Sequence, residues 1–121
     1  MSSLFRSYIG GFNIPMKGGS GRIDLSRPLA RLDIRPRRVS FHPRGLFKLV
    51  LQPRSVPFRM IQVAFPVAPV LFSGPGVGMS CSDGDYYFWT RRADEILCLL
   101  ESAGITVDAA PRYVRLRSLT F

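Results

Sequence analysis

Proline and glycine interrupt this chain so often that only short regular elements can form between them. The 121 residues include 10 Pro and 11 Gly, and from residue 36 onward a Pro or Gly follows nearly every apolar run. Proline ends helices and interior strands, and glycine favours turns. The intervening runs are rich in β-branched and aromatic residues and have the length of strands. The sequence therefore predicts a mainly β fold.

Seven short strands are expected between residues 30 and 89. Ala30, Leu32 and Ile34 alternate with charged residues, which is typical of a strand with one buried face. A turn at 36–37 leads to a second alternating run at 39–42, so these two strands form a hairpin. The other strands are expected at 46–52, 60–65, 67–72, 77–80 and 86–89. Frequent turns of this kind are typical of antiparallel barrels and sandwiches.

After Trp89 the periodicity changes from that of a strand to that of a helix. Thr90 can cap this helix and Gly104 can end it. The apolar positions recur at helical spacing, and they are Ala93, Ile96, Leu97 and Leu100. We expect this stripe to close the open end of the β-structure. The predicted fold class is mainly β (α+β), a seven-stranded antiparallel barrel or sandwich capped by one C-terminal amphipathic helix.

The composition divides the chain into three parts. Residues 1–22 are rich in glycine, with Gly-Gly-Ser-Gly at 18–21, and are expected to be a flexible segment. Residues 23–104 contain the predicted strands and helix, and they form the single domain that a chain of this length supports. Residues 105–121 include an alternating run and are expected to form a further strand or an arm.

The net charge of +9 is distributed unevenly along the chain. Residues 1–62 hold twelve basic and two acidic residues, a net +10, whereas residues 63–121 hold five basic and six acidic residues, a net −1. Guanidinium groups bind phosphates and carboxylates through paired, charged hydrogen bonds. The predicted site for an anion or a partner is the group of four arginines at the first hairpin, Arg31, Arg35, Arg37 and Arg38.

We expect a cytoplasmic protein that is at most peripheral at a membrane. The first 21 residues lack the continuous apolar segment of a signal peptide. Residues 60–82 carry no charge, but three prolines and three glycines would break a membrane-spanning helix there, so buried strands explain them better. Cys81 and Cys98 are expected to be free thiols, as in a reducing compartment.

Five segments carry a family resemblance: PLARL at 28–32, VPFRMIQV at 56–63, GVGM at 76–79, YFWT at 87–90 and DEILCLLESAG at 94–104. Over residues 28–104 the chain resembles uncharacterised bacterial proteins of the pleckstrin-homology-like superfold, which implies seven strands followed by one helix. In pleckstrin-homology domains that bind phosphoinositides, basic residues on the first two strands and their loop hold the headgroup. The resemblance places Arg31, Arg35, Arg37 and Arg38 at the matching positions.

Other candidate sites lack the partners that their chemistry requires. His42 is the single histidine, and Cys81 and Cys98 show no CxxC spacing, so neither a zinc site nor a nucleophile with its base is predicted. Asp83 and Asp85 lack the further oxygen ligands of a calcium-binding loop. We therefore predict no catalytic residue, no metal and no cofactor.

The predicted function is that of a non-enzymatic binding or assembly module. Its partner would be an anionic group, an anionic lipid surface or an acidic protein surface, bound by the arginines of the first hairpin. The positive charge also suits a nucleic-acid-binding module, whose affinity would fall steeply with added salt. A third alternative is a homo-oligomeric scaffold that associates through strand edges and the C-terminal arm.

Overall fold

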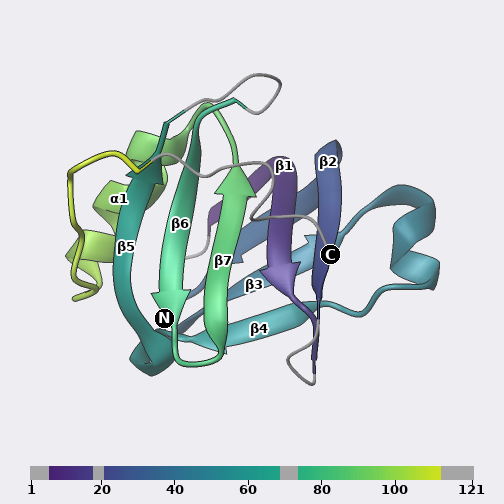
Figure 1. The fold of residues 1–121 in the computed structure, drawn as a ribbon, viewed down its shortest axis with the longest axis horizontal. Helices are drawn as coiled ribbons and strands as arrows, with labels where there is room; N and C mark the ends of the chain where they lie inside the picture. The colour runs from purple at the N-terminus through teal and green to yellow at the C-terminus, as the bar shows by residue number, and fades with distance from the viewer. Residues whose placement is uncertain (1–5, 18–20, 69–73, 113–121) are drawn as a thin grey trace.

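The architecture is an antiparallel sheet of seven strands that curls into a half-barrel (Figure 1). The computed structural model describes residues 6–17, 21–68 and 74–112. The strands are β1 (Arg6–Pro15), β2 (Arg22–Ile34), β3 (Arg38–Pro43), β4 (Arg54–Pro57), β5 (Ile61–Val67), β6 (Gly76–Cys81) and β7 (Gly84–Trp89). Their order across the sheet is β4-β3-β2-β1-β7-β6-β5, and α1 (Ala93–Ser102) follows β7 in the chain. The mainly β class, with seven strands and a C-terminal helix, is confirmed.

The prediction that residues 1–22 form a flexible segment is wrong for β1. This strand lies in the middle of the sheet, paired with β2 on one side and with β7 on the other. Three of its apolar side chains, Tyr8, Phe12 and Ile14, are buried. A Cβ atom at Gly10 would lie 2.1 Å from the carbonyl oxygen of Trp89. Glycine there allows close approach of the backbone to β7, and the folded domain begins before residue 23.

The predicted strand at 46–52 is also wrong, and the sheet contains two strands that were not predicted, β1 and β4. The run at 46–52 contains a short 3-10 helix, η1 (Gly45–Leu49), and none of the residues of η1 is buried. The predicted run at 60–65 lies in β5, which extends to Val67, and residues 69–73 lie outside the described residues. Another short helix, η2 (Phe58–Met60), precedes β5. Because β1 comes first, the predicted first hairpin joins the second and third strands, β2 and β3.

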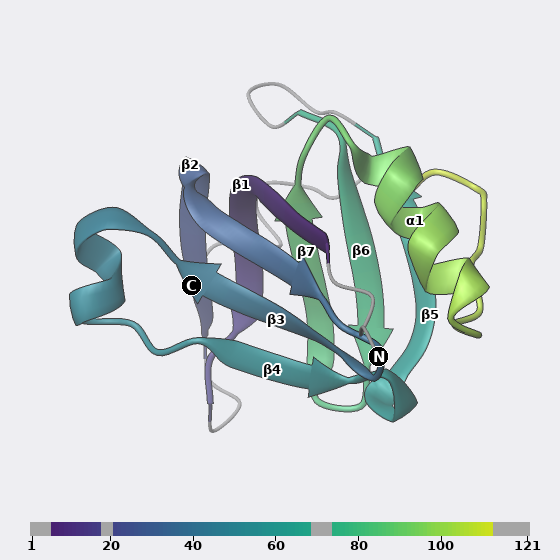
Figure 2. The ribbon, with the colours of Figure 1, turned by 180° about the vertical axis from the view of Figure 1, so that it is seen from behind.

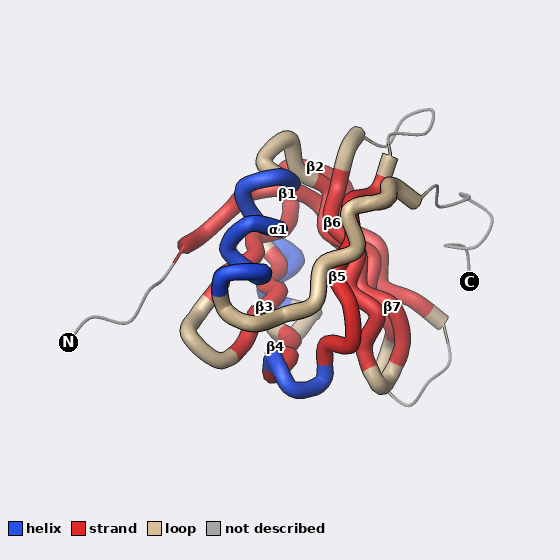
Figure 3. The backbone as a smooth tube through the Cα atoms, turned by 90° about the vertical axis from the view of Figure 1, so that its left-hand side faces the viewer, coloured by secondary structure: helices blue, strands red, loops and turns tan. Residues whose placement is uncertain are grey.

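The core lies within the curl of the sheet, with α1 packed against β5 and β6 (Figures 2 and 3). The Phe41 ring stacks on Tyr86 with centroids 5.4 Å apart and meets Phe12 edge-on at 6.0 Å. The predicted apolar stripe of α1 faces this core, where Ile96 and Leu100 are completely buried. Aromatic burial on this scale contributes much of the free energy of folding.

The segment after α1 runs beside β5, at the edge of the sheet. Parallel bridges pair Ala64 with Val107 and Val67 with Arg112. This segment is the first part of the predicted arm, and residues 113–121 lie outside the described residues. It satisfies backbone groups on a strand edge that would otherwise be open to pairing. With 10 residues α1 is too short to cross a bilayer, and none of the other described helices has the length and hydropathy to do so.

Candidate functional site

The β2–β3 turn brings three of the four predicted arginines together. The Arg35 N–H donates to the Arg38 carbonyl at 2.9 Å, which closes the turn. Residues 35–38 line a shallow pocket of about 320 Å³. The guanidinium groups of Arg37 and Arg38 are exposed and have no acidic partner among the described residues. Arg35, Arg37 and Arg38 are called the arginine turn below.

Arg31 does not line this pocket, because it pairs with a buried carboxylate. Asp33 is fully buried and accepts a hydrogen bond from the Ser7 hydroxyl at 2.6 Å. Arg31 Nη2 donates to Asp33 at 3.1 Å, and Arg35 Nη2 lies 3.9 Å from the same carboxylate oxygen. Part of the positive charge of the predicted site is therefore compensated within the protein.

His42 belongs to the same group of side chains. Its Nε2 lies 3.2 Å from Asp33 Oδ2, but without the geometry of a hydrogen bond. Burial lowers the pKa of His42, Arg31 and Arg35 lower it further, and Asp33 acts in the opposite direction. Over the part of the chain that the structure describes, no three His, Cys, Asp or Glu side chains converge in a way that could hold a metal ion. The arrangement around His42 is that of a packed strand residue.

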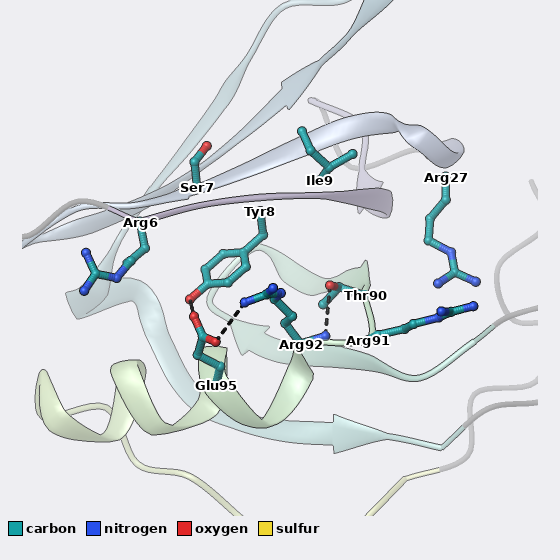
Figure 4. A pocket seen from close by; sticks show the side chains of 9 residues that line it. All are labelled: Arg6, Ser7, Tyr8, Ile9, Arg27, Thr90, Arg91, Arg92 and Glu95. Atoms are coloured by element: carbon teal, nitrogen blue, oxygen red, sulfur yellow. Dashed lines mark hydrogen bonds and ion pairs between the residues drawn. The ribbon is translucent and has the colours of Figure 1, made fainter.

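A second pocket, of about 670 Å³, lies between the start of β1, the middle of β2 and the beginning of α1 (Figure 4). Four arginines from three separate parts of the chain line it, and we call them the arginine pocket: Arg6, Arg27, Arg91 and Arg92. Sequence reasoning missed this set because Arg6, Arg27 and the Arg91–Arg92 pair are far apart in the chain. The general excess of arginine was the available signal, and it does not indicate which arginines meet.

Glu95, the acidic residue among those lining the arginine pocket, is already engaged. The Tyr8 hydroxyl donates to its Oε2 at 2.5 Å, and Arg92 Nη1 donates to its Oε1 at 3.3 Å. Burial and the bond to Glu95 raise the pKa of Tyr8 to about 12, and the same bond lowers the pKa of Glu95. The predicted cap residue, Thr90, accepts a hydrogen bond from the Arg92 N–H at 3.1 Å. It thereby fixes the turn before α1, whose N-cap is Arg92 itself.

Arg27 and Arg91 are the cations of the arginine pocket that the protein leaves available. Both are exposed, and within residues 6–17, 21–68 and 74–112 neither guanidinium group has a hydrogen-bonding or ion-pair partner. Figure 4 shows the two side chains reaching the same side of the pocket, away from Arg6. Each guanidinium carries five N–H donors and no acceptor. Together they can bind an anion that has several oxygen atoms.

The remaining candidates have structural surroundings. Cys81 is buried and Cys98 is exposed, both are free thiols, and burial raises the pKa of Cys81 to about 12. Asp83 accepts a hydrogen bond from the Tyr86 hydroxyl at 2.7 Å, and Asp85 accepts one from Ser80 at 2.9 Å. These carboxylates hold side chains at the β6–β7 turn.

No protein-family model and no curated protein sequence matches this chain. Among solved structures, the chain is similar to the C-terminal domain of an unknown protein from Leishmania infantum. The TM-score is 0.50 and the sequence identity is 15%, over 80% of this chain and 84% of that domain. At this identity the likeness concerns the fold alone, because one fold serves many functions.

Proposed function

We propose that this protein is a non-enzymatic module that binds an anionic group in the arginine pocket. The observation that carries the proposal is that Arg27 and Arg91 line one pocket without an acidic partner in the described chain. Arginine keeps its proton throughout the physiological pH range, and Glu95 is held by two hydrogen bonds. Such a set of groups suits electrostatic binding better than proton transfer.

The arginine turn is a second candidate for the same function. Its exposed guanidinium groups, Arg37 and Arg38, border a shallow pocket, which suits a broad acidic surface better than a small ion. A pleckstrin-homology-like identity is part of this proposal as well. Seven antiparallel strands followed by one helix support that identity.

Titration of isotope-labelled protein with inorganic phosphate, followed by NMR, tests the arginine pocket. We expect the largest amide shift changes at residues 6–9, 27 and 90–95. Replacing Arg27 and Arg91 together by Ala should weaken binding roughly tenfold or more, since hydrogen bonds to charged groups contribute about 1.5–3 kcal/mol each. Arg59→Ala is the matched control, because Arg59 is an exposed arginine on η2.

Four further measurements separate the alternatives. The double variant Arg37→Ala, Arg38→Ala can weaken phosphate binding while the Arg27→Ala, Arg91→Ala variant does not, and the arginine turn is then the site. If neither double variant changes phosphate binding, the proposal that these arginines bind an anion is wrong. Polyglutamate at the same ionic strength distinguishes an acidic protein surface from phosphate. An RNA or DNA shift assay across ionic strength tests nucleic-acid binding, and a mass well above 13.6 kDa by light scattering would indicate a homo-oligomer.

A further inference from the structure

The loop between β3 and β4 exposes apolar side chains that a folded protein ordinarily buries. Leu46, Leu49 and Val50 are 80%, 79% and 76% exposed, and Phe47 is 38% exposed. They lie on and directly after η1, which projects from the sheet on the side away from α1 in both views of the ribbon (Figures 1 and 2). Contiguous exposed apolar groups of this kind mark an interaction surface. The four residues are called the apolar tip below.

The apolar tip has a defined conformation. The Arg44 N–H donates to the Leu29 carbonyl at 2.8 Å, which ties the start of the loop to β2. The Leu51 N–H donates to the Phe47 carbonyl at 2.8 Å, and the Leu51 side chain packs partly against the core. The loop is therefore fixed before η1 by Arg44 and after η1 by Leu51, and the apolar side chains between these two residues point outward.

The charges that neighbour the apolar tip in the chain are of one sign. Arg44 and Lys48 are exposed beside it, and residues 34–82 contain neither Asp nor Glu. Apolar side chains with a basic border are the combination that binds at the interface of an anionic bilayer, where the apolar groups enter the acyl boundary and the cations meet the headgroups. An apolar groove of a protein partner would use the apolar tip but would have no need of flanking basic residues and an acid-free stretch of chain.

We propose that the apolar tip docks on the surface of an anionic lipid bilayer. Leu46, Leu49 and Val50 enter the boundary between headgroups and acyl chains, while Arg44 and Lys48 contact lipid phosphates. This inference is separate from the arginine pocket, because the two sets of residues have no member in common. It is also distinct from the arginine turn, which lies at the opposite end of β3.

Flotation with lipid vesicles tests the proposal on the full chain. We expect binding to phosphatidylcholine vesicles that contain about one third phosphatidylserine and much weaker binding to pure phosphatidylcholine. The double variant Leu46→Ser, Leu49→Ser should reduce partitioning on the order of tenfold or more. Met16→Ser is the matched control, because Met16 is a 44% exposed apolar residue in a different loop, and it should change partitioning less than about twofold.

The arginine-turn variant Arg35→Glu, Arg37→Glu, Arg38→Glu separates apolar insertion from general attraction of charge. Loss of binding in this variant, together with full binding by the double serine variant, would assign the contact to the turn and contradict the proposal. The absence of wild-type binding to the anionic vesicles would also contradict it. So would a dimer in light scattering that the serine variant abolishes without any change in flotation.

A second measurement reports insertion directly. Val50→Trp places a fluorophore in the apolar tip, while the natural Trp89 is only 8% exposed and supplies a constant background. We expect a blue shift of the emission when anionic vesicles are added, and no shift with pure phosphatidylcholine. Vesicle binding without a blue shift would show that another surface makes the contact.

Discussion

Asp33 shows how one buried charge organises a group of polar side chains. Its register partners on the neighbouring strands are Ser7 on β1 and Ser40 on β3. The Ser7 hydroxyl and Arg31 Nη2 both donate to its carboxylate. A buried carboxylate is tolerated because such donors replace the water that it loses. The Asp33 side chain therefore joins β1 to β2.

Replacing Asp33 by Ala should destabilise the protein by about 1–3 kcal/mol, because Ser7 and Arg31 would lose their acceptor. Arg31 is 42% exposed and can turn toward water, so the larger penalty for a fully buried unpaired charge does not apply. Urea denaturation measures the change, with Glu101→Ala on the exposed face of α1 as the control. Equal stability of the wild type and Asp33→Ala would show that this group contributes nothing.

Stability should fall as the pH decreases through the range in which histidine titrates. Burial lowers the pKa of His42 in the folded state below its ordinary value of 6.5. The unfolded chain therefore takes up the proton first, so the contribution of His42 is complete above about pH 6.5 and is lost below it. Denaturation at about pH 8 and about pH 5.5 should show this loss, and His42→Gln should remove it. An unchanged pH dependence in His42→Gln would contradict the assignment.

Sequence patterns predicted the alternation of Leu32 and Ile34 with charged residues but not the burial of Asp33. Alternation assigns a side chain to a face of a strand, and a face is open to solvent only if nothing else packs on it. Asp33 is surrounded by side chains from its own and neighbouring strands, among them Ser7 of β1, and β1 was expected to be flexible. For the same reason the sequence identified the arginine turn, which is local, and missed the arginine pocket, which requires β1 and α1 to meet.

Among the elements, β1 joins the two halves of the sheet and was the least predictable. Its glycines at 10 and 11 belong to a composition that is typical of a linker. In the fold they are the positions of closest approach, because a Cβ atom at Gly11 would lie 2.5 Å from the Leu25 carbonyl oxygen. By contrast α1 was predicted well, since its apolar stripe and its terminal glycine are local signals.

A chain that begins at Met16 should fail to fold cooperatively. It would lack β1, so β2 and β7 would each lose the neighbour that joins the two halves of the sheet. Circular dichroism and amide dispersion in NMR spectra measure the loss. Gly10→Val tests the same strand in a full-length chain, because its side chain would overlap the Trp89 carbonyl and the Phe88 ring. Native spectra from both variants would show that β1 is dispensable.

Across the whole molecule, the division of charge along the chain is not a division in space. The basic part, residues 1–62, supplies Arg6 and Arg27 to the arginine pocket, and the nearly neutral part supplies Arg91 and Arg92. The fold thus assembles a positive site from both parts of the sequence. The β3–β4 loop keeps its basic character by itself, because no acidic residue is near it in the chain.

The central place of β1 also determines when the sheet can be completed during synthesis. β1 and β2 can pair as soon as both have left the ribosome, but the Phe12–Phe88 pairing must wait for β7. At about 5–20 residues per second this delay is on the order of ten seconds or less. During this delay the edge of β1 that later pairs with β7 is unpaired, and strands of neighbouring nascent chains can pair with it. The exposure of the β1–β2 hairpin to neighbouring chains therefore ends only when β7 has been made and pairs with β1.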